Sequence, residues 1–164
     1  MLAETLNDPR RLTMLALIGA AAVFIAALIS QYGFGWRPCV LCLWQRYPYA
    51  IGGALALGGL MRPAQAPLLW GLASIAFLAN VALAAFHSGV EFGWWEGFAS
   101  CSAPDPGAVS AQELFERLQE VSLVRCDDRT PFLFELTMTN WNLLVCAGFA
   151  ALLGRAAMLS PRHS

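Results

Sequence analysis

The chain carries little charge and contains no lysine. Only 13% of its 164 residues are charged, all ten basic residues are arginines, and 58% of the residues are hydrophobic. A soluble domain carries nearly twice that charged fraction, so the composition indicates an integral membrane protein. The sequence has no basic patch, no glycine-rich phosphate loop and no dinucleotide-binding motif. We therefore expect no nucleic acid partner and no nucleotide cofactor.

Long apolar runs, separated by short polar turns and one long loop, predict transmembrane helices. Each run is close to the roughly 20 residues that cross a bilayer. The predicted spans cover residues 12–30, 43–61, 68–86 and 141–159. We therefore predict an all-α integral membrane protein in which residues 1–164 form a single membrane domain, a four-transmembrane-helix bundle.

The predicted loops on one side of the membrane are residues 31–42 and 88–139. In the longer loop, Ser110 and Glu113 form a capping box, and apolar residues follow at helical spacing. This pattern predicts a short amphipathic helix that lies on the membrane surface or packs on the spans. Glu91 and Glu96, near the start of the loop, are interpreted as solvated charges.

Four of the five cysteines fall on one side of this topology. They are Cys39, Cys42, Cys101 and Cys126. Thiols that pair require an oxidising compartment, so we expect this side to be periplasmic and both termini to be cytoplasmic, in a multi-pass protein of the bacterial inner membrane. The fifth cysteine, Cys146, lies inside the fourth span and is expected to be an inert, buried thiol.

The segment Cys39-Val40-Leu41-Cys42 suggests a reactive dithiol. A helix that begins near Cys42 would place unpaired N–H groups and partial positive charge beside its sulfur, and Arg46, one turn later, would add a full charge. Both effects would lower the pKa of Cys42. An arginine so close to an apolar span is costly without a partner, which favours a functional role.

Other uses of a Cys-X-X-Cys pair fit less well. A zinc site needs a second pair of ligands, and Cys101 and Cys126 are too far apart in sequence to supply the usual one, so we expect no metal. Haem attachment requires a histidine where Leu43 stands. A structural disulfide that closes so short a loop stabilises by only about 2 kcal/mol.

Two cysteine pairs on one face can form a relay, because mixed disulfides pass electrons from one pair to the other. At the bilayer edge, a lipid-soluble oxidant such as a quinone is the natural acceptor. His87, at the end of the third span, lies at the depth where it could bond a quinone oxygen or pass a proton. The alternative is an interfacial histidine that faces water or a backbone carbonyl.

Several segments together resemble the DsbB family of bacterial disulfide bond formation proteins. They are Cys39-Val40-Leu41-Cys42-Leu43-Trp44-Gln45-Arg46, the segment from His87 to Cys101, the segment from Cys126 to Trp141, and the four spans. The resemblance implies a quinone-dependent thiol oxidase that reoxidises DsbA, a thioredoxin-like periplasmic protein, and reduces ubiquinone or menaquinone.

The resemblance also implies residue roles. Cys39 and Cys42 are the quinone-linked pair, and Cys101 exchanges with DsbA and has Cys126 as its loop partner. The resemblance assigns quinone binding to Cys42 and Arg46, and the position of His87 makes it a third candidate. An alternative from another class is a four-helix membrane scaffold or transporter subunit with two structural disulfides. The resting pairing stays open, because four cysteines allow three connectivities.

Overall fold

The computed structural model describes residues 7–98, 125–127, 129 and 131–160. The described residues are mostly helical. The helices are α2 (Pro9–Tyr32), the short α3 (Val40–Trp44), α4 (Arg46–Met61), α5 (Ala66–Glu91) and α7 (Met138–Leu159), and a 3₁₀ turn (Pro63–Gln65) precedes α5. Two short strands, β1 (Pro131–Leu133) and β2 (Leu136–Thr137), pair antiparallel as a hairpin directly before α7.

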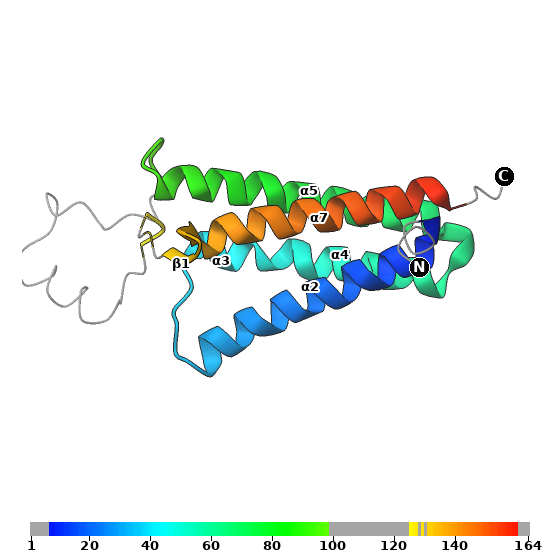
Figure 1. The fold of residues 1–164 in the computed structure, drawn as a ribbon, viewed down its shortest axis with the longest axis horizontal. Coiled ribbons are helices and arrows are strands. Elements are labelled where there is room, and N and C mark those ends of the chain that lie inside the picture. Colours follow the sequence, from blue (N-terminus) through cyan, green and yellow to red (C-terminus); the bar gives the residue numbers. More distant parts are fainter. Residues whose placement is uncertain (1–6, 99–124, 128, 130, 161–164) are drawn as a thin grey trace, which may run out of the picture.

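Helices α2, α4, α5 and α7 form the bundle, and α5 and α7 pack along each other (Figure 1). The start of α2 and the end of α7 lie at one end, whereas α3 and the hairpin lie at the other. Large apolar side chains such as Ile18, Ile25 and Ile75 point outward, each more than half exposed. An apolar outer surface of this kind is suited to lipid.

Three helical segments are long and apolar enough to cross a membrane: α2, α5 with its preceding 3₁₀ turn, and α7. The predicted span 43–61 is instead divided at Gln45 into α3 and α4. Pro48 lacks the N–H that would bond the Trp44 carbonyl, which accounts for an interruption at this point. The 16 residues of α4 extend only about 24 Å, so a fourth span stays a prediction.

Two helices extend beyond the predicted spans at the cysteine end of the bundle. The third span was expected to end at residue 86, but α5 continues to Glu91, and the Phe92 N–H still bonds the Ser88 carbonyl at 2.9 Å. The fourth was expected to begin at residue 141, but α7 begins at Met138, because Thr137 and Asn140 cap it reciprocally.

The predicted amphipathic helix that begins near Ser110 lies outside the described residues, and so does Cys101.

Aromatic rings fill the middle of the bundle. Tyr49, Phe77 and Phe149 meet edge to face, with ring centroids 5.4–6.3 Å apart. Small residues on α4 allow the rings to approach closely. A Cβ atom added to Gly59 would clash with Nε1 of Trp70, which donates a hydrogen bond to the Ala56 carbonyl. The packing of α4 on α5 therefore depends on this glycine.

Gly59→Ala is expected to destabilise the bundle by about 1–3 kcal/mol, because the Trp70 ring must move and its hydrogen bond is lost. Thermal unfolding in detergent measures the effect. Gly71→Ala is the matched control, because its added Cβ meets no atom within 4 Å. Equal stability losses in the two variants would contradict the close α4–α5 contact.

Candidate functional site

Cys39 and Cys42 lie at the N-terminus of α3. The helix begins at Val40, so Cys39 is its N-cap, and the Cys39 Sγ accepts a hydrogen bond from the Cys42 N–H at 3.3 Å. The two Sγ atoms are 3.1 Å apart. Cys39 is buried, whereas Cys42 is partly exposed. The pair is therefore preorganised for thiol–disulfide exchange, with Cys42 as the more accessible sulfur.

The hydrogen bond between the two sulfurs makes them unequal. The Cys39 thiol donates to the Cys42 sulfur, and this bond together with burial raises the pKa of Cys39 to about 12. The same hydrogen bond lowers the pKa of Cys42, against the opposing effect of its burial. Cys42 is therefore the favoured thiolate, as predicted, but the cause is the Cys39 thiol instead of an adjacent arginine.

Arg46 begins α4, and its Nη1 donates a hydrogen bond to Oε1 of Gln31 in the last turn of α2. The expected partner for this costly cation is thus a neutral amide on another helix. Among the contacts between described residues, none joins Arg46 to either cysteine. Arg46 connects the start of α4 to the end of α2, one helical turn beyond the dithiol.

His87 lies beside the dithiol and is only 2% exposed. Its Nε2 is 3.6 Å from the Cys39 Sγ. Its Nδ1 is 3.0 Å from Nε2 of Gln45 and 3.3 Å from Oγ1 of Thr139. The alternative of an interfacial histidine facing water is therefore wrong, because the extra turn of α5 buries the ring against α3 and α7.

Glu91 lies one turn after His87 on the same face of α5. Its side chain is 6% exposed, and its Oε1 is 3.9 Å from Nε2 of His87. The hydroxyls of Thr137 and Thr139 each donate to one carboxylate oxygen at 2.7 Å. Its interpretation as a solvated loop charge is wrong, because α5 continues to this residue and carries it into the bundle.

A hydrogen-bonded chain of polar side chains continues from His87 into the bundle. Asn142 donates to Oε1 of Gln45 at 2.6 Å, and the Tyr49 hydroxyl donates to Oδ1 of Asn142 at 2.6 Å. Because its oxygen is already used, Gln45 presents its NH₂ group to Nδ1 of His87. Gln45 and Asn142 were not among the predicted site residues.

Cys146 is fully buried inside α7, as predicted. Its Sγ lies 3.2 Å from Nδ2 of Asn80 and 3.2 Å from the Tyr49 hydroxyl. This sulfur occupies a polar position in the bundle interior and belongs to neither predicted cysteine pair.

Cys126 lies far from Cys39 in sequence but packs in the same buried cluster, together with Leu41 and Val90. Only 2% of its surface is exposed. The partly exposed Cys42 packs against this cluster. The structure thus brings together three of the four predicted catalytic cysteines, while Cys101 lies outside the described residues.

Comparison with known proteins identifies the family. Residues 9–156 match the family described as Disulfide bond formation protein DsbB. The chain belongs to the DsbB family. A protein of Chromohalobacter salexigens named Disulfide bond formation protein B is 31% identical over 85% of this chain and 83% of its own length. One of the same name from Dechloromonas aromatica is 30% identical over 82% of this chain and 83% of its own.

An uncharacterised protein of Rickettsia prowazekii is 27% identical over 85% of this chain and 83% of its own length. No solved structure matches the chain significantly. Membership of the DsbB family assigns this membrane protein to the oxidoreductases of disulfide bond formation.

Cysteine and histidine are the residue types of a zinc site. In this DsbB-family chain, the sulfurs of Cys39 and Cys42 and a ring nitrogen of His87 lie within 4.8 Å of one another. Two thiolates on one tetrahedral zinc ion, with Zn–S bonds of about 2.3 Å, lie about 3.8 Å apart. The 3.1 Å between the two sulfurs is shorter than that. The spacing fits a dithiol poised to form a disulfide better than a metal site.

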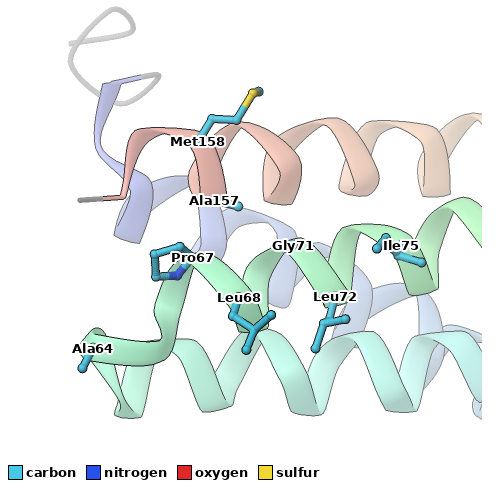
Figure 2. Close-up of a pocket in the computed structure, with 8 residues that line it drawn as sticks. All are labelled: Ala64, Pro67, Leu68, Gly71, Leu72, Ile75, Ala157 and Met158. Carbon is cyan, nitrogen blue, oxygen red and sulfur yellow. The ribbon is translucent and has the colours of Figure 1, made fainter. Parts of the chain in front are cut away.

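An apolar groove of about 570 Å³ lies between the first turns of α5 and the end of α7 (Figure 2). This is the end of the bundle opposite α3 and the hairpin (Figure 1). The groove is lined by Ala64, Pro67, Leu68, Gly71, Leu72, Ile75, Ala157 and Met158. None of these side chains titrates or acts as a nucleophile, so the groove has no chemistry of its own. The candidate site is therefore the cluster of Cys39, Cys42, His87, Glu91 and Cys126.

Proposed function

We propose that this DsbB-family chain is a quinone-dependent thiol oxidase of the bacterial inner membrane. Its donor is a DsbA-like thioredoxin-fold protein, and its acceptor is ubiquinone or menaquinone. The observation that carries the proposal is the Cys39–Cys42 pair, with sulfurs 3.1 Å apart and His87 3.6 Å from Cys39, at one end of an apolar helical bundle. The proposal includes a single domain with four spans, cytoplasmic termini and periplasmic cysteine pairs.

Electrons pass through two disulfides in this proposal. The donor's dithiol reduces a Cys101–Cys126 disulfide and becomes a disulfide itself. Exchange then reduces the Cys39–Cys42 disulfide and restores the loop pair. Two electrons and two protons leave the Cys39–Cys42 dithiol for the quinone, which becomes a quinol. The packing of Cys126 in the cluster that contains Cys39 supports the exchange between the pairs.

The residues around Cys42 fit a quinone. Arg46 is a hydrogen-bond donor suited to a quinone oxygen, and Cys42 is the partly exposed sulfur. His87, beside Cys39, is placed to pass a proton. Exposed aromatic side chains, Trp44 and Tyr47, offer an apolar surface near the same end of α4. When bound, the quinone supplies a two-electron acceptor, while the protein holds it, excludes water and moves protons.

The experiment that tests the proposal follows quinone absorbance after the purified, quinone-loaded protein is mixed with a reduced thioredoxin-fold donor. We expect one quinone to be reduced for every two donor thiols that are oxidised. If folded, quinone-loaded protein reduces no quinone with any dithiol donor, the scaffold with two structural disulfides replaces the oxidase.

Arg46→Ala is expected to weaken quinone binding about ten- to a hundredfold, since a hydrogen bond to a charged group contributes about 1.5–3 kcal/mol. Quinone titration of the stripped protein measures the change. Arg37→Ala is the control, because Arg37 is an exposed arginine in the link between α2 and α3. Unchanged affinity in Arg46→Ala would remove Arg46 from the quinone site.

A further inference from the structure

Glu91 is a buried carboxylate that a nearby positive charge would stabilise. Its side chain is 6% exposed, and the only ion pair that it makes among the described residues is the 3.9 Å contact with Nε2 of His87. The hydroxyls of Thr137 and Thr139 satisfy both carboxylate oxygens. Burying a charge without a partner of opposite sign is costly, so Glu91 stabilises a positive charge that His87 acquires.

The surroundings of Nδ1 accommodate either neutral tautomer of His87. Thr139 gives its hydroxyl proton to Glu91, so its oxygen can accept from a protonated Nδ1 at 3.3 Å. In this tautomer Nε2 is unprotonated and can accept a proton. Gln45 presents an NH₂ group, which can donate to an unprotonated Nδ1 at 3.0 Å in the other tautomer, whose proton is already on Nε2.

The other ring nitrogen faces the sulfur that must lose a proton. Nε2 lies 3.6 Å from the Cys39 Sγ, and Cys39 is the protonated member of the pair. On the inner side of His87, the polar chain continues through the amides of Gln45 and Asn142, which do not titrate. Glu91 is therefore the acidic group that can offset the positive charge on protonated His87.

The titratable groups around His87 come from few elements. The N-cap and first turn of α3 contribute Cys39 and Cys42, α5 contributes Glu91, and Cys126 packs in the cluster that contains Cys39. Among the described residues, the joint between α3 and α4 presents only the uncharged Gln45 to the ring, and α7 presents only the uncharged Thr139.

We propose that Glu91 is the positioning residue that enables His87 to accept the proton of the Cys39 thiol when the Cys39–Cys42 disulfide re-forms. The inference rests on the proposed redox role of this pair. In the step, the S–H bond of Cys39 breaks, its proton moves to Nε2 of His87, and the Cys39 thiolate attacks the Cys42 sulfur. The Cys42 sulfur is at this point bound to its oxidant, and the electron pair of that bond leaves with the departing group. Glu91 offsets the positive charge that His87 acquires.

The test uses a small aromatic disulfide that releases a coloured thiolate, with neither quinone nor donor protein present. The full chain carries Cys101→Ser, Cys126→Ser and Cys146→Ser, so that only one pair reacts. A first phase, attack by the Cys42 thiolate, releases one coloured thiolate. A second phase, attack of Cys39 on the mixed disulfide, releases another and requires loss of the Cys39 proton. Stopped-flow absorbance separates the two phases.

Glu91→Gln keeps the acceptor oxygen and removes the charge. We expect it to slow the second phase about ten- to a hundredfold at pH 7, within the range of general base catalysis, and to leave the first phase within about twofold. The second phase of the variant should then rise about tenfold per pH unit, while that of the native pair rises less steeply. Glu96→Gln, the same change at an exposed position, should alter neither phase.

Two further variants keep the inference falsifiable. Thr139→Val removes a hydroxyl that donates to Glu91, and it should slow the second phase in the same direction. In a His87→Gln background, Glu91→Gln should cause no additional loss, because the carboxylate acts through the ring. Equal slowing of both phases in Glu91→Gln, or additive losses in the double variant, would overturn the proposal. Because the assay contains no quinone, this result is independent of whether quinone is the acceptor.

Discussion

Cys42→Ser is expected to abolish quinone reduction, with a rate at least about a thousandfold below that of the native chain. Cys42 is the favoured thiolate of the pair, because the Cys39 thiol donates a hydrogen bond to it and lowers its pKa. A serine hydroxyl cannot form a disulfide with Cys39 and is a far weaker nucleophile at neutral pH. Quinone absorbance after mixing with the reduced donor measures the loss.

Cys146→Ser is the matched control for this change, because it makes the same substitution at a buried sulfur away from the dithiol. Its quinone reduction should stay within a few-fold of native. If Cys42→Ser still reduced quinone at the native rate while remaining folded, Cys42 would have no place in the electron path.

Cys101→Ser is expected to stop oxidation of the protein donor, again by about a thousandfold, while quinone binding stays native. Cys101 is the predicted contact for the donor, and without it no mixed disulfide can form at the loop pair. The Cys39–Cys42 pair remains intact in this variant. A small dithiol that reaches Cys42 directly should therefore still support quinone reduction.

The two substrates make the prediction specific. Donor oxidation is followed by trapping free thiols, and the small-dithiol reaction is followed by quinone absorbance in the same preparation. Normal oxidation of the protein donor by Cys101→Ser would mean that the relay through two cysteine pairs is wrong. Loss of both reactions would instead indicate damage to the Cys39–Cys42 site.

Much of the dithiol site could be predicted from local sequence. The apolar run that follows Cys42 predicts a helix that begins near this residue, and hydrophobic run lengths locate α2, α5 and α7 to within about five residues. The preference for a Cys42 thiolate was also predicted, although its cause was not. A hydrogen bond between neighbouring thiols depends on side-chain rotamers, which the spacing does not determine.

The buried carboxylate was missed because the end of α5 was placed too early. His87 and Glu91 are four residues apart, a spacing that puts them on one helical face, and Gly93, with a φ of +70°, is a suitable place for the chain to turn after the helix. Extending the predicted helix to that glycine would have paired the two residues. Burial of Glu91 by Thr137 and Thr139 depends on contacts with α7 that no local pattern contains.

The interruption at Gln45 also has a mechanical consequence. It leaves Cys39 and Cys42 at the start of a five-residue helix that is separate from α4. The side chain at that joint is tied both to Nδ1 of His87 and to Asn142 on α7. A tilt of α3 that turned a sulfur toward a new partner would therefore also displace the amide that contacts the imidazole ring. The positions of the sulfurs and of the ring are thus linked through a single side chain.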